Sequence, residues 1–216
     1  MEKKEYTLRE KKFARTKIAL MNEFIARMKA SRFDDISIQE ICKNVEVSDG
    51  TFFNYFPEKV DIVNYYRQLF FLNIVWKARK ETPAGKYLAL INCAFEKLAQ
   101  GQDNLNIVHQ ILSIMLVQKG KPGTVNISDI EKHLAFPDCE GIEEMQIVFI
   151  DVFFEECLIG AVKNGELPEN ADIDDILISL LAIMGGTVLA AKLRNVKDRK
   201  YHYSRQLKLL WKGLGG

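Results

Sequence analysis

The sequence predicts an all-α fold of about nine helices, with an N-terminal domain of three helices and a larger helical C-terminal domain. Apolar residues recur at intervals of three and four along most of the 216 residues, which is the spacing of one helix face. Only five prolines occur, and none lies before Pro57 or between Pro83 and Pro122. Short stretches with Gly or Pro separate the apolar segments, so we expect long helices joined by short turns.

The first helix is expected over residues 8–31. Its apolar positions step by four, three, four and three, as one helix face requires: Ala14, Ile18, Met21, Ile25 and Met28. One face of this helix must therefore be buried.

Two short helices follow, each marked by a serine N-cap. Ser37 and Glu40 have the spacing of a capping box, in which the serine side chain accepts from the third helical amide and the glutamate accepts from the serine amide. Ser48 is a second N-cap, before residues 49–54. Two such helices, three or four residues apart, are typical of a helix-turn-helix, whose second helix lies in the major groove of DNA.

A long helix is expected from Pro57 to about residue 80, because proline is tolerated in a first turn. Ser128 and Glu131 form another capping-box pattern before Phe136. The domain boundary is placed at the long helix, with residues 1–56 as the helix-turn-helix domain and 57–216 as the larger domain. The remaining helices are expected over residues 84–100, 104–119, 140–164, 172–193 and 198–214.

The composition is typical of a soluble globular protein, with a net charge of +1, 48% hydrophobic and 27% charged residues. The longest apolar run, residues 176–191, contains Gly185 and Gly186 and is shorter than the roughly 20 residues that a membrane-spanning helix needs. Residues 1–5 are charged and do not form a secretory signal. We therefore expect a cytoplasmic protein without a membrane partner.

No catalytic or metal-binding pattern is present in the sequence. The three histidines share no ligand spacing with one another or with cysteine, and neither a hydrolase motif nor a phosphate-cradling glycine motif occurs. We expect no enzyme activity, no cofactor and no metal ion. Four cysteines, far apart and without a C-x-x-C motif, are expected to be buried thiols: Cys42, Cys93, Cys139 and Cys157.

Two stretches of the N-terminal domain resemble one known family. Residues 33–41, FDDISIQEI, and residues 47–59, VSDGTFFNYFPEK, resemble the signature of the TetR family of transcriptional regulators. The resemblance covers about residues 8–63, under a third of the chain. It implies a homodimeric repressor that binds a palindromic double-stranded DNA operator and releases it when a small-molecule effector enters the C-terminal domain.

The resemblance also assigns DNA contacts by position. Contacts in the groove are implied for Gln39, Asp49, Gly50, Thr51 and Asn54. Phosphate contacts are implied for Ser37, Tyr55 and Lys59. Physical chemistry agrees with several of these, because glycine lets the backbone approach the duplex and a threonine methyl can touch a thymine methyl. A lysine beside a helix N-terminus suits a phosphate.

Three residues depart from the family pattern. Phe53 stands where a tyrosine hydroxyl usually reaches a phosphate, so this contact is expected to be lost. Glu46 stands where the turn usually has glycine, and a left-handed backbone there would cost about 1–2 kcal/mol. Asp49 either stabilises the dipole of the recognition helix or accepts from a cytosine amine. Phe52 and Phe56 are expected to form the core beneath that helix.

Positive charge is concentrated before the helix-turn-helix. Residues 1–32 hold ten basic and four acidic residues, whereas residues 33–64 hold two basic and seven acidic ones. Attraction to phosphate is therefore expected from the N-terminal segment, including Arg15 and Lys17 in the first helix. The alternative is that these side chains form a solvated helix end.

The C-terminal domain is expected to carry the dimer interface and an effector pocket. The helix over residues 172–193 has almost no polar face, so a partner subunit is its natural cover, and the alternative is burial within its own subunit. Interface residues are expected on the last two helices: Leu180, Met184, Gly185, Gly186, Val188, Leu207 and Trp211. Pocket residues, or ordinary core, are expected among Phe70, Phe71, Cys93, His109, Met115, Phe149 and Phe153.

The sequence is thus interpreted as a ligand-responsive, DNA-binding transcriptional regulator. The competing hypothesis is a helical protein-interaction adaptor that keeps the motif as a scaffold after losing specific DNA binding. Phe53, Glu46 and the acidic residues 33–64 would permit this second reading.

Overall fold

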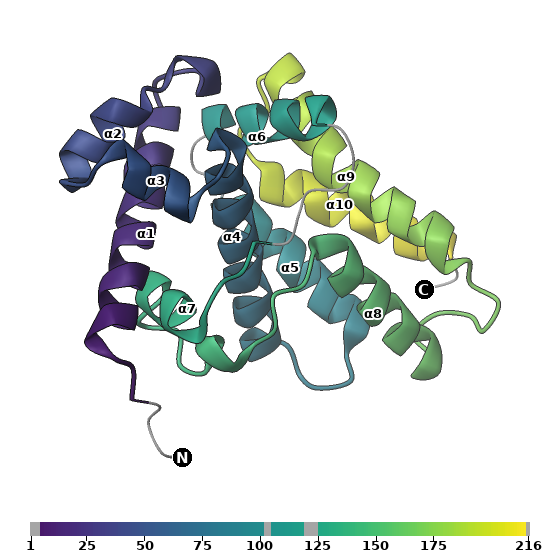
Figure 1. Ribbon diagram of the computed structural model, residues 1–216. Coiled ribbons are helices and arrows are strands. Elements are labelled where there is room, and N and C mark those ends of the chain that lie inside the picture. The colour runs from purple at the N-terminus through teal and green to yellow at the C-terminus, as the bar shows by residue number, and fades with distance from the viewer. Residues whose placement is uncertain (1–4, 102–104, 119–124, 215–216) are drawn as a thin grey trace. The chain divides into compact units, whose positions relative to one another are not determined.

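The computed structural model describes residues 5–101, 105–118 and 125–214. Over these residues the chain forms ten α-helices, two short 3-10 helices and no strand, which confirms the all-α prediction (Figure 1). The α-helices are α1 (Leu8–Met28), α2 (Ile38–Val45), α3 (Asp49–Tyr55), α4 (Lys59–Glu81), α5 (Tyr87–Gly101), α6 (Leu105–Val117), α7 (Asp129–Ala135), α8 (Ile150–Lys163), α9 (Ile173–Arg194) and α10 (Arg199–Gly213). The 3-10 helices are η1 (Phe33–Asp35) and η2 (Ile142–Glu144).

The chain packs into two compact units, each built from two separate stretches. Unit 1 comprises Met1–Leu72 and Gln110–Ile147, and unit 2 comprises Asn73–His109 and Val148–Gly216. The predicted helix-turn-helix domain, residues 1–56, lies wholly in unit 1, together with the first part of α4, the end of α6 and α7. Two helices, α4 and α6, therefore contribute residues to both units.

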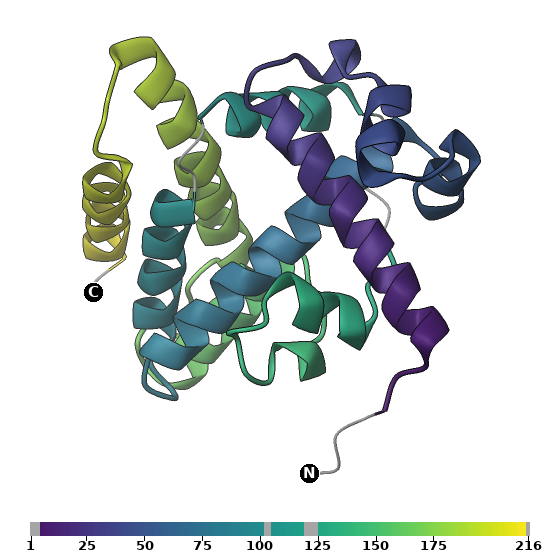
Figure 2. The same cartoon turned by 90° about the vertical axis from the view of Figure 1, so that its left-hand side faces the viewer.

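In unit 1, α1 buries one face as its spacing predicted, since all five residues of the expected stripe are inaccessible or nearly so. The helix begins at Thr7, whose side chain accepts from the Glu10 amide while the Glu10 carboxylate accepts from the Thr7 amide. Figure 2 shows α7 alongside α1, and α2 also packs against it. The core of unit 1 includes the fully buried rings of Phe24, Phe52 and Phe56.

In unit 2, α5, α8, α9 and α10 pack around buried aromatic rings. The ring of Phe95 stacks on Phe154 at 5.3 Å and meets the edge of Tyr203 at 5.2 Å. Figure 1 shows α10 running beside α9, with α5 beside α8. Gly160 of α8 is buried against the ring of Tyr87, at the start of α5.

The predicted helix over residues 140–164 is wrong in its first half. Gly141 has a left-handed backbone with φ of 81°, η2 is a single turn, and α8 begins only at Ile150. The buried ammonium of Lys132 explains the interruption, because it donates to the backbone carbonyls of Glu143 and Met145 at 3.0 and 2.7 Å. These carbonyls are available because they are not used in a helix. The capping box at Ser128 and Glu131, by contrast, is present and begins α7.

Among the described residues, α9 is the one helix that is long and apolar enough to cross a membrane. The helix is longer than the apolar run of residues 176–191, on which the prediction of no membrane-spanning segment was based. Within unit 2, however, α9 is bound to α10 by polar contacts. The Tyr203 hydroxyl donates to the Met184 carbonyl at 3.0 Å, and the Gln206 amide donates to the Thr187 hydroxyl at 2.8 Å. The helix is therefore part of the packed helical layer of unit 2.

Candidate DNA-binding site

The turn between α2 and α3 has the geometry that the motif requires. Helix α2 ends at Glu46, whose backbone is left-handed with φ of 59° and ψ of 43°. The Val47 amide then donates to the Cys42 carbonyl at 2.9 Å, which closes the helix end as a Schellman motif does. The backbone at Glu46 is therefore left-handed despite the missing glycine, and it is strained, because glutamate has a Cβ atom where glycine has none.

Only half of the capping box predicted at Ser37 forms. The Ser37 hydroxyl accepts from the Glu40 amide at 3.4 Å, but the Glu40 carboxylate is paired with the guanidinium of Arg27 on α1. Arg27 also donates to Glu23 at 2.9 Å, and Glu23 accepts from the Asn44 amide of α2 at 2.8 Å. These donated hydrogen bonds lower the pKa of Glu23. The carboxylate of Glu40 therefore ties α2 to α1 instead of capping α2.

Helix α3 buries one side and exposes the other. Phe52 and Phe56 are fully buried, with ring centroids 5.7 Å apart, and Phe56 meets the edge of Tyr65 at 5.5 Å. This confirms that both phenylalanines belong to the core. The exposed side of α3 carries four residues from the sequence analysis: Asp49, Gly50, Phe53 and Asn54. Gln39 of α2 is also exposed. Four of the five expected groove residues are therefore accessible to a partner: Gln39, Asp49, Gly50 and Asn54.

The first turn of α3 is organised by Ser48. Its hydroxyl accepts from the Thr51 amide at 3.2 Å and shares a hydrogen bond with the Thr51 hydroxyl at 2.9 Å. The Thr51 hydroxyl is thus engaged within the protein, which leaves its methyl group for a groove contact. Asp49 does not cap α3. It lies close to Cys42, and the pKa of the Cys42 thiol is raised to about 11, mainly by burial and then by the negative charge of Asp49.

Gly50 has no structural reason to be glycine. Its φ is not positive, and a Cβ atom added there would meet only the Ser48 hydroxyl oxygen, at 3.8 Å. The fold would therefore accept alanine at this position. A requirement for glycine could only come from something outside the chain that approaches the α3 backbone closely.

Two of the expected phosphate-contacting residues, Tyr55 at the end of α3 and Lys59 at the start of α4, are partly held by contacts within the protein. The Tyr55 ring lies 4.4 Å from the ring of Phe13 on α1, and its hydroxyl is hydrogen-bonded to Thr16. The Lys59 ammonium donates to the Asp34 carbonyl at 3.1 Å and lies 4.9 Å from the centre of the Phe33 ring. Burial lowers the pKa of Lys59. One N–H of the ammonium is used here, so two remain for a phosphate.

Lys17 does not belong to the DNA-contacting set. Its side chain is buried, and the ammonium pairs with Glu131 of α7 at 3.0 Å and donates to the Asn126 carbonyl at 2.9 Å. The ring of Tyr65 lies 4.4 Å away. An ammonium that is already surrounded cannot reach a phosphate from this position, so the structure corrects this prediction. Arg15, two residues earlier, is exposed and remains a candidate.

Sequence reasoning did not identify Phe13 as part of this surface. It is 49% exposed on α1, and its contact with Tyr55 brings α1 against the end of α3. The available signal was a large aromatic residue within a run of exposed basic ones, because Arg9, Lys11 and Lys12 precede it on α1. The surface of unit 1 around α3 thus combines exposed cations with exposed phenylalanine rings, including Phe53.

The expected effector-pocket residues are divided between the two units. Phe70, Phe71 and Met115 belong to unit 1, whereas Cys93, His109, Phe149 and Phe153 belong to unit 2. Phe153 is fully buried beside Phe154, as ordinary core. None of the seven lines the cavity found in unit 1, described below. No group of three or more His, Cys, Asp or Glu side chains in the described part of the chain could hold a metal ion.

Four of the expected interface residues are buried within unit 2: Leu180, Val188, Leu207 and Trp211. The Trp211 indole donates to Asn92 on α5 at 3.0 Å, so it is held inside its own unit. Met184 and Gly185 are partly accessible, and Gly186 is exposed. The exposed apolar stripe of α9 consists of other residues, spaced by four, four, three and four: Ile178, Ala182, Gly186, Leu189 and Leu193.

Solved structures with a similar fold are transcription regulators. The fatty acid degradation regulator FadR from Bacillus halodurans is 18% identical over 91% of this chain and 98% of its own, with a TM-score of 0.59. A TetR transcription regulator from Haloarcula marismortui ATCC 43049 is 14% identical over 93% of this chain and 96% of its own, with a TM-score of 0.60. The sequence itself matches no protein-family model and no curated protein. The chain therefore has the fold of TetR-type regulators, as its helix-turn-helix residues indicated.

Proposed function

We propose that this protein is a transcriptional regulator that binds a palindromic DNA operator as a homodimer and leaves it when a small-molecule effector binds. The observation that carries the proposal is the exposed side of α3. It follows a left-handed turn, its first turn is capped by Ser48, and it presents Gly50, which the fold itself does not require. This is the arrangement of a helix that enters a major groove.

Selection of bound sequences from random duplexes tests the DNA-binding half of the proposal. The enriched site should be a palindrome with half-site centres about 34–36 Å apart, or a multiple of that distance, because two recognition helices must enter successive grooves. A pool that shows no enrichment and no salt-sensitive binding would favour the adaptor hypothesis instead. The acidic residues 33–64 make that a real alternative.

Lys59→Ala tests the phosphate contact at the start of α4. Binding should weaken equally for all sequences, and the slope of log affinity against log salt should flatten by about one unit per subunit, since one counterion fewer is released. Lys192→Ala is the matched control, because it removes an exposed lysine from α9 in unit 2. Equal slopes for Lys59→Ala and the wild-type protein would exclude this contact.

The apolar stripe on α9 supports the homodimer. Five small or apolar residues face outward along one side of the helix, and an unbroken exposed apolar surface of this kind is a common mark of an interface. Sedimentation should give about twice the 24.8 kDa of one chain at micromolar concentration. Leu189→Glu should shift the protein to monomer, whereas Leu116→Glu, on the exposed side of α6, should not. A wild-type protein that remains monomeric contradicts the proposal.

Effector release is proposed to act through α4. This helix carries Lys59 in unit 1 and continues to Trp76 in unit 2, so a change in its tilt would move the proposed phosphate contact. Linkage then requires operator DNA to weaken effector binding by the same factor by which the effector weakens DNA binding. A ligand found by thermal-shift screening should bind differently with and without operator.

A further inference from the structure

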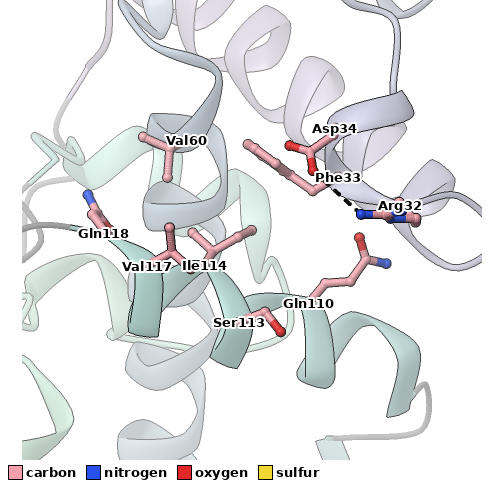
Figure 3. A pocket seen from close by; sticks show the side chains of 9 residues that line it. All are labelled: Arg32, Phe33, Asp34, Val60, Gln110, Ser113, Ile114, Val117 and Gln118. Atoms are coloured by element: carbon pink, nitrogen blue, oxygen red, sulfur yellow. Dashed lines mark ion pairs between the residues drawn. The ribbon is translucent and has the colours of Figure 1, made fainter.

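Unit 1 contains a cavity of about 450 Å³ beside the helix-turn-helix (Figure 3). Its walls come from residues 32–34 before α2, from Val60 in the first turn of α4, and from the second half of α6. The volume lies within the range of about 300–1,000 Å³ that is usual for small-molecule sites. All lining residues belong to unit 1, so the cavity is complete within it.

The cavity has an apolar end and a polar end. Figure 3 shows the side chains of Val60, Ile114 and Val117 together on one side of the space, with the polar side chain of Gln118 beside them. On the other side lie Arg32, Asp34 and Gln110, with the Phe33 ring between the two groups. A ligand that matches these walls is an amphiphile with its apolar body against α4 and α6.

The polar end presents a fixed and unused hydrogen-bond acceptor. The Gln110 amide nitrogen donates to the carbonyl of Met28 at 2.9 Å and to that of Ser31 at 3.0 Å. These two acceptors use both amide hydrogens and fix which way the amide faces. Its oxygen, Oε1, is buried and accepts no hydrogen bond. Buried acceptors without a donor are uncommon in proteins, so a ligand N–H or O–H would satisfy this one.

The polar end offers no buried charge to pair with a charged head group, since the side chains of Arg32 and Asp34 are 80% and 77% exposed. Arg32 and Asp34 form an ion pair at 4.0 Å and offset each other. A carboxylate in the cavity would face the Gln110 oxygen and the Asp34 carboxylate. An ammonium could donate to Gln110, but it would bring a charge against the apolar walls, and burying a charge costs more than burying a neutral donor. A hydroxyl or a primary amide donates to Gln110 without bringing in a charge.

We propose that this cavity is a binding site for an uncharged amphiphile, an alcohol or a primary amide with an apolar chain, whose head group donates to Gln110 Oε1. Its occupation has a direct consequence for the neighbouring α4. Phe33 lines the cavity and also lies under the Lys59 ammonium, and the Asp34 carbonyl accepts from that same ammonium. If the proposed function holds, on which this consequence rests, a ligand packed on Phe33 acts on the phosphate contact.

Binding of octan-1-ol to the full-length protein, without DNA, tests the site. Calorimetry should show saturable binding, and labelled-methyl NMR should show shifts concentrated at Val60, Ile114 and Val117. Two probes of the same chain length separate the head-group chemistry. Octanoate carries a charge, and 1-methoxyoctane has no donor, so both should bind about fivefold or more weakly than the alcohol. Failure of octan-1-ol to saturate, or equal affinity of the alcohol and the ether, would overturn the proposal.

Two tryptophan variants of α6 locate the site. Ile114→Trp fills the apolar end and should weaken octan-1-ol binding by about tenfold or more, a loss of about 1.4 kcal/mol. Leu116→Trp adds the same side chain at a position that is exposed and does not line the cavity, so its affinity should stay within about twofold of wild type. Equal weakening in both variants would overturn the proposal. The wild-type methyl shifts decide the question if Ile114→Trp does not fold.

A DNA measurement keeps this inference separate from the proposed function. With the selected operator duplex, saturating octan-1-ol should change operator affinity in the wild-type protein and leave it unchanged in Ile114→Trp. Alcohol binding without any operator binding would support the site and contradict the regulator. Operator binding without alcohol binding would support the regulator and contradict the site.

Discussion

The two units bury their helices in chemically different ways. In unit 1, α7 is held on α1 by an ion pair whose partners are almost inaccessible, Lys17 at 5% and Glu131 at 2% exposed. In unit 2, α8 is held on α5 by shape, with Gly160 against the Tyr87 ring and Phe154 stacked on Phe95. The first contact depends on matched charges and the second on the absence of one methyl group. Opposite kinds of substitution should therefore break them.

The largest effect is expected from breaking the buried ion pair. Glu131→Ala would leave the Lys17 ammonium buried beside the Asn126 carbonyl and the rings of Tyr65 and Phe56, with no carboxylate to pair with it. Removing one partner of a buried pair costs about 3–5 kcal/mol, because the remaining charge keeps its desolvation penalty. Urea denaturation should show this loss in the free energy of unfolding. Glu155→Ala, which removes an exposed carboxylate from α8, should change it by less than about 0.5 kcal/mol.

A double variant distinguishes a buried charge from a general packing defect. Both Glu131 variants also lose the hydrogen bond from the Ser128 amide that caps α7. Replacing both partners of the ion pair, Lys17→Met with Glu131→Leu, should recover the part of the loss that comes from the unpaired charge. If the double variant is as unstable as Glu131→Ala, the cost lies in packing and in the lost cap, and the contrast between the two units disappears.

The second effect concerns the close contact in unit 2. A Cβ atom at Gly160 would lie 2.4 Å from the Tyr87 ring, so Gly160→Ala must displace the ring or separate α8 from α5. Overpacking of this kind costs about 1–3 kcal/mol. Gly213→Ala is the matched control in unit 2, at the exposed end of α10, where nothing lies within 4 Å of the new atom, and there alanine should be neutral or stabilising. A Gly160→Ala protein as stable as wild type would show that Tyr87 moves freely.

The parts of the fold that could be predicted depend on residues close together in the sequence. The α1 stripe, the serine N-caps and the capping box of α7 depend on residues three or four apart. The same is true of α3, whose buried and exposed sides follow from Phe52 and Phe56, four residues apart. These local patterns were sufficient to predict the helix-turn-helix, whereas its candidate DNA contacts came from the family resemblance.

What could not be predicted depends on partners far apart in the chain. Lys17 looks like an exposed helix cation until Glu131, more than a hundred residues later, is placed beside it. The interruption before α8 is stabilised by the Lys132 ammonium, whose acceptors lie 11 and 13 residues away and so outside the spacing of a helix face. On α9 and α10, helical spacing identified apolar faces but not which face the unit itself covers. Leu180 and Trp211 are therefore inside unit 2, while Leu189 is exposed.

The smallest effect, and the finest comparison of the two units, concerns their helix ends. In the described part of the chain, two residues other than glycine have a left-handed backbone: Glu46 after α2, with φ of 59°, and Asn195 after α9, with φ of 51°. Asparagine adopts this conformation several times more readily than most residues, whereas glutamate gains no such relief. Unit 1 therefore stores strain at a position where unit 2 stores little.

Replacing each residue by glycine measures that difference. Glu46→Gly relieves about 1–2 kcal/mol of strain but adds about 0.5–1 kcal/mol of backbone entropy to the unfolded chain, so a net gain of about 0–1.5 kcal/mol is expected. For a chain of this size each kcal/mol gained raises Tm by about 2–4 °C. Asn195→Gly starts from less strain and should leave Tm unchanged or slightly lower. Equal changes in the two variants would mean that Glu46 is not strained. A lower Tm for Glu46→Gly would mean that the Glu46 side chain makes a contact whose stabilising effect is larger than the strain of its left-handed backbone.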